Sequence, residues 1–367
     1  MPGSKASGPE PGARMIRKSF LLLALAAVAA ILLTCSPIYV LRAGFEEARI
    51  LRRRTPIDEV IRDPATDEER RRKLELVLQA RTFAANTLGL DVGGSYTTYS
   101  WIDRDTLALV LSAARKDRFQ QKTWWFPIVG HVPYKGYFNP RSALEAAQAL
   151  EREGYDTYVR PTSAFSTLGW FDDPLLSTLL RADDVDLVST VIHELAHNTL
   201  YLPSQVAFNE SFASFVGDRG AIAYFCGIEG EDGRRCRTAR DRWADNLLFA
   251  SFLQDLIARL EELYARTDIP RDSILARREV IFQDARDRFR NEIQPAFRSY
   301  TFGSFLTTPL NNATLIARRL YYDRLHLFDA AFEQHGGDLP ATIRAVVAAA
   351  EAARDDPYGA LGRLTAP

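Results

Sequence analysis

Two histidines four residues apart, with a glutamate directly after the first, form the clearest chemical pattern in the chain. His193, Glu194 and His197 belong to the string His-Glu-Leu-Ala-His. Positions i and i+4 share one face of an α-helix and lie about 6 Å apart along its axis, so both imidazoles can reach one metal ion. Zinc accepts imidazole nitrogens readily. The pattern therefore predicts one zinc ion per chain bound by His193 and His197, with Glu194 beside it as general base.

A third protein ligand is expected, because a catalytic zinc usually has three and leaves one position for water. A helix expected over 205–216 and its continuation would place Glu210, Ala213 and Gly217 on one face. The two small residues would let this face pack close to the histidine-bearing helix. We therefore predict Glu210 as the third ligand, with Asp218 as its competitor.

The setting of the string decides between a metal site and a chance match. From 187 to 202, Glu194 is the only carboxylate, lysine or arginine, and most of its neighbours are apolar. A charge in such a buried helix is costly unless it is paired or lies near a metal. The alternative is a buried helix in which Glu210 makes an ordinary ion pair, and the spacing of the small residues favours the metal site.

Peptide hydrolysis on such a site would need a donor for the oxygen that develops negative charge. Tyr321 is the first candidate, because a helix over 311–334 could reach the cleft. Tyr322 and His326 are the next candidates. The alternative is that all three are ordinary residues of an amphipathic helix.

Two acidic residues are candidates for holding a substrate ammonium. Asp172 and Asp173 follow a segment at 166–171 that could be an edge strand binding substrate backbone. Both could equally cap a turn before Pro174.

The pattern along the chain predicts an α+β fold. Residues rich in β-branched and aromatic side chains predict strands, and 3.6-residue periodicity predicts helices. Strands are expected at 95–101, 107–112, 123–129 and 155–161, and helices at 42–88 (broken near Pro56 and Pro64), 141–153, 185–201, 205–216, 237–266, 273–295, 311–334 and 339–353. We expect one domain over 45–367, with a small mixed sheet in 45–181 and a mostly helical half in 182–367. The histidine-bearing helix is expected between the sheet and the other helices, and the active-site cleft between the two halves.

Residues 1–44 predict a tail followed by a membrane-targeting segment. Arg17 and Lys18 precede an uncharged run at 19–41, and about 20 apolar residues are enough to cross a bilayer. A basic flank before an apolar run is also typical of a signal peptide, and Cys35 lies in a string similar to a bacterial lipidation site. The segment therefore predicts attachment to the membrane of the bacterial cell envelope, through a signal anchor at 19–41 or a lipidated Cys35, with the catalytic domain outside the cytoplasm.

Charge and cysteine content narrow the classes of partner. The formal net charge is −1 and the pI about 6.6, which gives no support for nucleic-acid binding. The chain has no Cys-x-x-Cys pair, so a thiolate zinc site is unsupported. Cys226 and Cys236 lie ten residues apart; they could form a disulfide outside the cytoplasm or remain two free thiols.

Several strings resemble those of known peptidases. Asn209-Glu210-Ser211-Phe212-Ala213 is similar to a motif of the gluzincin aminopeptidases. The strings at 125–130 with 134–138, at 166–178 and at 193–213 resemble a bacterial family of predicted aminopeptidases, and the likeness runs from about residue 45 to 360.

That resemblance implies a zincin-like fold and a membrane-attached, often lipoprotein-type, zinc peptidase acting on peptides or proteins. It implies His193, His197 and Glu210 as zinc ligands and Glu194 as the base. The chain departs from the well-known gluzincins in one respect: their third ligand would correspond to position 217, which here is Gly217.

Two other classes of function remain open. The same zinc chemistry would serve an endopeptidase of the cell envelope. A non-catalytic envelope-binding protein could keep the fold without the reaction, but it would not need Glu194.

Overall fold

The computed structural model describes residues 54–102, 108–126, 130–137, 139–162 and 174–365. They belong to two units. The larger unit comprises residues 50–122 and 134–367, and residues 123–133 belong to the smaller unit. In the smaller unit, strands β4 (Trp124–Phe126) and β5 (Gly130–Val132) form an antiparallel hairpin in which Trp125 pairs with His131. The remaining elements belong to the larger unit.

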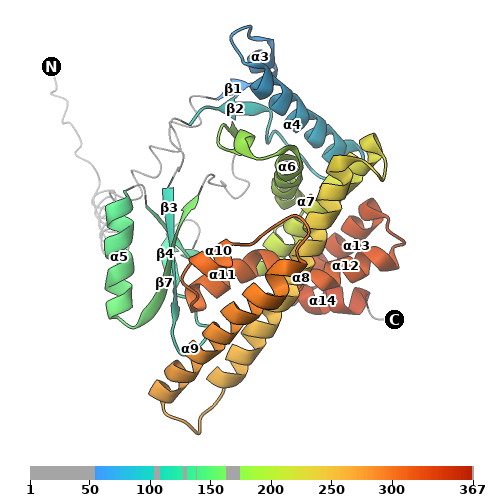
Figure 1. Ribbon diagram of the computed structural model, residues 1–367. Helices are drawn as coiled ribbons and strands as arrows, with labels where there is room; N and C mark the ends of the chain where they lie inside the picture. Colours follow the sequence, from blue (N-terminus) through green and yellow to red (C-terminus); the bar gives the residue numbers. More distant parts are fainter. Residues whose placement is uncertain (1–53, 103–107, 127–129, 138, 163–173, 366–367) are drawn as a thin grey trace, which may run out of the picture. The chain divides into compact units, whose positions relative to one another are not determined.

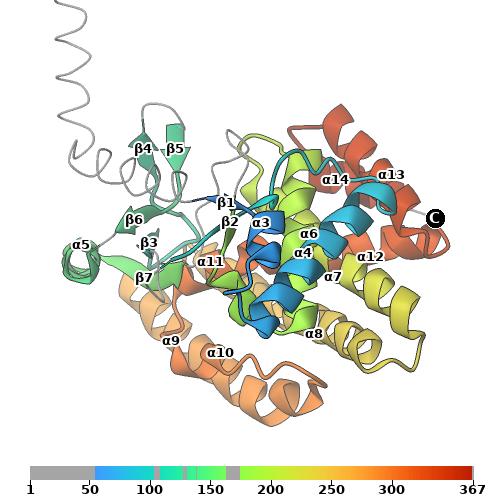
Figure 2. The same ribbon diagram turned by 90° about the horizontal axis from the view of Figure 1, so that it is seen from above.

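Three long helices form the centre of the larger unit: α6 (Asp184–Thr199), α7 (Val206–Glu229) and α8 (Arg234–Tyr264). The Asp183 side chain caps α6 by accepting hydrogen bonds from the backbone N–H groups of Val185 and Asp186. Helix α7 packs against both α6 and α8, and α4 (Glu68–Asn86) packs against another side of α6 (Figures 1 and 2). The histidine-bearing helix is thus surrounded by other helices.

Aromatic side chains hold these helices together. Phe208, Phe212 and Phe215 of α7 are fully buried and all contact the ring of Phe328 in α12 (Leu325–Gln334). A fully buried Phe contributes roughly 1.5–3 kcal/mol relative to an exposed one. One side of α7 is therefore anchored in the core, which leaves its opposite side to face α6.

The other helices of the larger unit lie before and after this centre. They are α3 (Ile57–Arg62), α5 (Pro140–Arg152), α9 (Arg271–Arg288), α10 (Ser304–Thr307), α11 (Asn312–Tyr322), α13 (Leu339–Ala352) and α14 (Pro357–Leu364). Short 3-10 turns at Leu179–Arg181 and Gln294–Ala296 and a π-helical turn at Phe289–Ile293 complete the helical elements described.

Two small sheets belong to the larger unit. Strands β1 (Thr55–Pro56), β2 (Thr98–Ser100) and β8 (Leu175–Leu176) form a mixed sheet in the order β1-β2-β8. Strands β6 (Lys135–Tyr137), β3 (Ala108–Arg115) and β7 (Tyr155–Thr162) form an antiparallel sheet with β3 in the middle. Helix α5 packs along the second sheet (Figure 1).

The architecture is α+β, with most described residues in helices, but it differs from the expected one in three ways. The described strands form three separate small sheets instead of one, because β2 pairs with β1 and β8 while β3 pairs with β6 and β7. The helix expected over 205–216 continues to Glu229. The helix expected over 311–334 is two helices, since Arg324 adopts a left-handed conformation with φ 50°.

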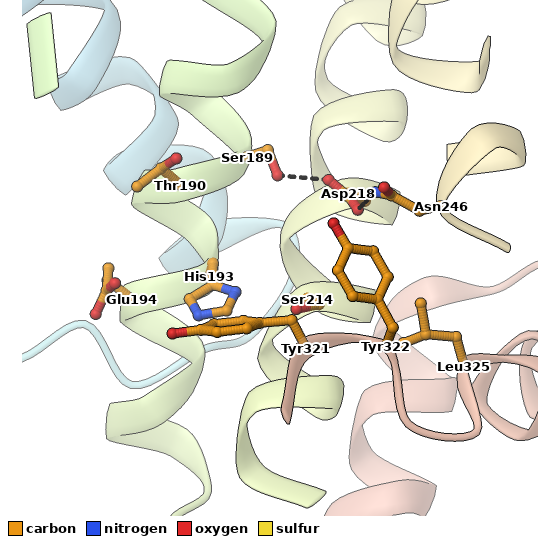
Figure 3. Close-up of a pocket in the computed structure, with 10 residues that line it drawn as sticks. All are labelled: Ser189, Thr190, His193, Glu194, Ser214, Asp218, Asn246, Tyr321, Tyr322 and Leu325. Atoms are coloured by element: carbon orange, nitrogen blue, oxygen red, sulfur yellow. Dashed lines mark hydrogen bonds between the residues drawn. The ribbon is translucent and has the colours of Figure 1, made fainter. Parts of the chain in front are cut away.

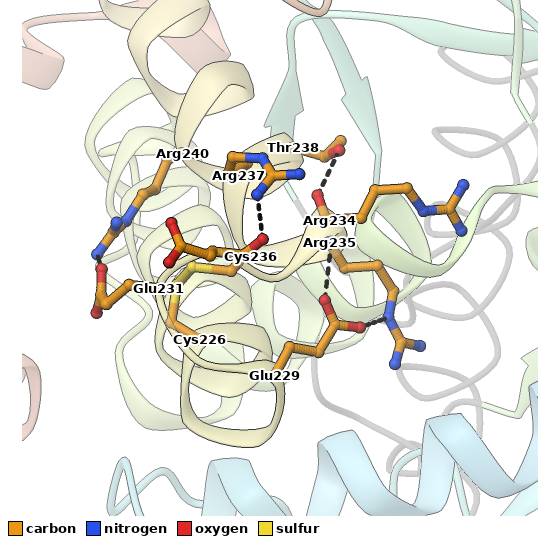
Figure 4. Close-up of a disulfide and its surroundings, with 10 residues drawn as sticks. Cys226, Glu229, Glu231, Arg234, Arg235, Cys236, Arg237, Thr238 and Arg240 are labelled. Atoms are coloured by element: carbon orange, nitrogen blue, oxygen red, sulfur yellow. Dashed lines mark hydrogen bonds and ion pairs between the residues drawn. A yellow bond between two sulfur atoms is a disulfide. The ribbon is translucent and has the colours of Figure 1, made fainter.

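Cys226 and Cys236 form a disulfide that joins the end of α7 to the start of α8 (Figure 4). Of the two alternatives left open by the sequence, the structure contains the disulfide. Ion pairs of Arg235 with Glu229 and of Arg240 with Glu231 lie beside it. The turn between α7 and α8 is therefore fixed by a covalent bond and by charge pairs.

Among the described residues, no helix is long and apolar enough to cross a membrane. The predicted anchor at 19–41 and the candidate lipidation site Cys35 lie outside the described residues, as do Asp172, Asp173 and the edge strand expected at 166–171.

Candidate metal centre and the pocket beside it

The structure brings together the three residues that the sequence predicts as metal ligands. His193 Nε2 lies 3.5 Å from one carboxylate oxygen of Glu210, and His197 Nε2 lies 3.8 Å from the other. One potential ligand atom from each of the three residues lies within 4.8 Å of the others. Two ligands about 2.1 Å from a tetrahedral zinc are about 3.4 Å apart. The donor set of two imidazoles and one carboxylate therefore fits zinc in both chemistry and spacing.

Glycine at position 217 lets helix α7 approach α6 closely enough for this arrangement. A Cβ atom at Gly217 would lie 2.7 Å from the Ser189 carbonyl oxygen and 3.0 Å from the Cβ of His193. Both distances are shorter than van der Waals contact. The small face predicted from Ala213 and Gly217 therefore packs on α6, and Gly217 contacts the backbone of α6 beside the first histidine.

The connection between the two helices is held by Asn209, the residue before Glu210. Its side-chain oxygen accepts from the backbone N–H of Leu202 at 3.0 Å, and its side-chain nitrogen donates to the carbonyl of Leu202 at 2.8 Å. Asn209 is almost fully buried. This pair of hydrogen bonds fixes the start of α7 relative to the end of α6, and so fixes the position of Glu210.

Burial and mutual charge set the protonation of the three residues. Burial lowers the pKa of His197 to about 4, a change that the neighbouring His193 reinforces. Burial also opposes the charged forms of His193 and Glu210, but their contact outweighs it: the pKa of His193 is raised and that of Glu210 is lowered. Metal binding requires carboxylates and imidazoles that have lost their protons, and the cluster contains a carboxylate and a neutral His197.

Glu194 lies beside the cluster without joining it. It lines a pocket of about 290 Å³ together with His193, and it is absent from the three-residue group. This is the placement expected of a base that acts next to a metal ion.

The Tyr321 ring of α11 lies next to the His193 imidazole of α6 (Figure 3). The two ring centroids are 6.3 Å apart with the planes tilted by 30°, and Figure 3 shows the tyrosine ring lying across the histidine. Burial, with the negative charge of Glu210, raises the pKa of Tyr321. Its hydroxyl therefore keeps its proton at neutral pH and remains a hydrogen-bond donor.

Helix α11 reaches this position because α7 holds its end. The Ser211 hydroxyl donates to the carbonyl of Leu320 at 3.2 Å and accepts from the backbone N–H of Asp323 at 3.1 Å. At the other end, Asn311 and Thr314 form a reciprocal capping box. Ser211 directly follows the candidate ligand Glu210, so one short string positions both the carboxylate and the tyrosine.

The other two candidates for the hydrogen-bond donor, Tyr322 and His326, lie in different surroundings. Tyr322 lines the pocket, whereas His326 is exposed and follows the break at Arg324. His326 does not line the described pocket, and the helix predicted to carry it there is interrupted at Arg324.

Asp218, the competing candidate for the third ligand, does not join the three candidate ligands. Its carboxylate accepts hydrogen bonds from the Ser189 hydroxyl and the Asn246 side-chain nitrogen, both at 2.7 Å. It lies outside the three-residue group and lines the pocket beside it (Figure 3). Burial raises the pKa of Asp218.

The described pocket is lined by residues of α6, α7, α8 and α11 and by Leu325 at the start of α12. The cleft expected between the sheet-containing and the helical half remains a prediction. Helix α7 packs against α6, α8 and α11 around this space.

Two residues near the cluster carried no functional prediction. Arg160 of β7 lowers the pKa of Glu210 by its charge, and Glu210 contributes to a raised pKa of Tyr134, whose main cause is burial. Tyr134 belongs to the family-like string at 134–138, which is the one signal that could have identified it. Arg160 has no such signal, because only the fold brings this strand residue near α7.

The chain belongs to the family described as Putative aminopeptidase, whose family model matches residues 38–357. Membership supports a peptidase that acts on peptides or proteins. Comparisons with curated proteins and with solved structures give no match.

Proposed function

We propose that the protein is a zinc-dependent aminopeptidase. The observation that carries this proposal is the grouping of His193, His197 and Glu210 within 4.8 Å, with Glu194 and Tyr321 on the adjoining pocket. The family description supports peptide-bond cleavage from the amino end.

The side chains have separate roles in this proposal. His193, His197 and Glu210 hold the zinc ion, which when bound supplies a Lewis acid and makes water a stronger nucleophile. Glu194 removes a proton from the attacking water and passes it to the leaving amine. The Tyr321 hydroxyl donates a hydrogen bond to the oxygen of the scissile carbonyl as it gains negative charge.

The cellular location in this proposal is the bacterial envelope, outside the cytoplasm. The Cys226–Cys236 disulfide supports it, because disulfides persist mainly in oxidising compartments. The predicted anchor at 19–41 or lipidated Cys35 would attach the chain to the membrane. Protease treatment of intact spheroplasts tests this: protection of the domain at 45–367 from digestion would place it inside the cytoplasm.

The activity is tested by measuring bound zinc and the hydrolysis of peptides by the full chain in detergent. Removing the general base in Glu194→Gln should lower kcat about 10²–10⁴-fold while zinc remains bound at one ion per chain. Glu75→Gln is a matched control, because Glu75 is an exposed glutamate on α4. Equal activity of wild type and Glu194→Gln would overturn the mechanism.

Blocked substrates separate the two peptidase classes. An aminopeptidase cleaves peptides with a free amino terminus and leaves their N-acetylated counterparts intact. Cleavage of both sets at internal bonds would replace the aminopeptidase with the endopeptidase alternative. Bound zinc without hydrolysis of any peptide would favour the non-catalytic alternative.

A further inference from the structure

The pocket beside the candidate metal centre is polar. Apart from His193, Glu194 and Leu325, its lining carries hydroxyl, amide or carboxylate groups: Ser189, Thr190, Ser214, Asp218, Asn246, Tyr321 and Tyr322. Figure 3 shows the Tyr322 hydroxyl directed toward Asp218, at the end of the pocket away from Glu194. A pocket with this lining suits a substrate group that forms hydrogen bonds.

Asp218 is the carboxylate at that end. Its two hydrogen-bond donors, Ser189 and Asn246, are both neutral. Among the described residues, no lysine or arginine forms a salt bridge with Asp218. A poorly solvated carboxylate without a cationic partner is costly. A cation entering the pocket would reduce this cost.

The distance along the helices indicates which cation fits. Helices α6 and α7 are joined by a short turn and pack antiparallel, with Gly217 against His193 and Asp218 against Ser189. Glu210 and Asp218 are eight residues apart on α7, which is about 12 Å along its axis.

The α-ammonium of a substrate residue lies only about 2.5 Å from the carbonyl carbon of the same residue, so it stays close to the scissile bond. A lysine side chain extends about 6 Å from Cα and can reach farther into the pocket. The pocket volume of about 290 Å³ accommodates such a side chain. A long side chain ending in an ammonium or guanidinium group therefore reaches farther toward Asp218 than the α-ammonium does, and it carries the matching charge.

We propose that this pocket is a specificity subsite in which Asp218 binds a lysine or arginine side chain of the substrate residue next to the scissile bond. This inference rests on the proposed peptidase function for the identity of its ligand. Ser189 and Asn246 hold the Asp218 carboxylate in place, and the hydroxyls of Ser214 and Tyr322 offer further acceptors for the basic group. A glutamate side chain would be repelled, and an aliphatic one would leave the carboxylate without a cation.

Binding without turnover tests the subsite. The probes are the tripeptides Lys-Ala-Ala and Ala-Lys-Ala, each paired with the same peptide carrying norleucine, which matches lysine in length but has no charge. Each is titrated calorimetrically into full-length Glu194→Gln protein loaded with zinc. We expect lysine in one of the two positions to bind at least about tenfold more tightly than norleucine. Equal affinity of lysine and norleucine peptides at both positions would overturn the proposal.

Two variants separate charge recognition from a structural role. Asp218→Asn should remove the preference for lysine, because the amide keeps the size and the hydrogen-bonding ability but loses the charge. Asp218→Asn combined with Asn246→Asp keeps one carboxylate in the pocket and should restore much of that preference. An equal loss for lysine and norleucine peptides in Asp218→Asn, or no recovery in the double variant, would show that Asp218 only holds the helices.

Hydrolysis by the wild type distinguishes failure of this inference from failure of the proposed function. Cleavage of all peptides without regard to lysine would retain the peptidase and reject the subsite. A preference for lysine in binding, without cleavage of any peptide, would retain the subsite and reject the peptidase.

Discussion

The two ends of helix α6 both carry charged residues, but their surroundings differ. At its start, the Asp184 carboxylate forms ion pairs with Arg72, Lys73 and Arg235. In its second half, His193 and His197 face Glu210. Three permanent cations surround the first acid, whereas the second acid faces two imidazoles.

The pKa values follow this difference. Hydrogen bonds from Arg72, supported by Lys73, lower the pKa of Asp184 to about 2. Burial raises the pKa of Asp218, and the opposing hydrogen bonds from the neutral Ser189 and Asn246 side chains do not cancel this effect. Acids surrounded by arginine stabilise the fold, and acids left without permanent cations in a pocket are available to a metal or a substrate. The following predictions test this division.

The largest effect is expected at the carboxylate ligand. Glu210→Gln should weaken zinc binding more than about 100-fold, since loss of even an indirect partner costs 10–100-fold in affinity. Competition with a zinc chelator measures this affinity. Retention of one zinc ion with unchanged affinity would exclude Glu210 as a ligand. Asp184→Asn is the comparison variant and should leave zinc affinity unchanged.

Removal of the Tyr321 hydroxyl should have the next largest effect. We expect Tyr321→Phe to lower kcat about 10²–10³-fold with little change in KM, as observed when one oxyanion donor is removed. Tyr155→Phe removes the hydroxyl of a β7 tyrosine that does not line the pocket, and it serves as the control. A similar kcat in both variants would contradict the role assigned to Tyr321.

A methyl group at position 217 should separate the two helices. Gly217→Ala introduces a Cβ 2.7 Å from the Ser189 carbonyl, and overpacking of this kind costs about 1–3 kcal/mol of unfolding free energy. Gly227→Ala is a matched control on the same helix, since nothing lies within 4 Å of its added Cβ. Denaturant unfolding and a zinc-affinity titration should show lower stability and weaker zinc binding in Gly217→Ala. Both quantities should stay unchanged in Gly227→Ala.

The smallest effect is expected at the start of α6, and it concerns stability alone. The pKa of Asp184 is about 2 in the folded protein and near its ordinary value, about 3.9, in the unfolded chain. Its contribution is therefore present above pH 4 and is lost as the pH falls toward 2.

Asp184→Asn should lower stability at neutral pH and flatten this part of the stability profile, with kcat unchanged. The free energy of unfolding of the wild type and of Asp184→Asn, measured between pH 2 and 7, tests this. The same dependence on pH in both proteins would contradict the prediction.

Local spacing allowed much of the candidate site to be predicted. His193 and His197 share a helical face by the geometry of the helix, and Gly217 follows Glu210 at a spacing that keeps both toward α6. Tyr321 could only be a first choice among three, because its place depends on Ser211 and on the break at Arg324. Arg160 could not be predicted, because it reaches the cluster through the pairing of β7 with β3.

The sequence by itself determined the metal-binding string, its helix and the small-residue face that lets a second helix approach, because these follow from a repeat of 3.6 residues. Only the tertiary structure decided that Asp218 accepts hydrogen bonds from Ser189 and Asn246, that the strands form separate sheets, and that α11 brings Tyr321 to His193. These contacts join residues far apart in the chain, and their partners are selected by packing and burial of the whole fold.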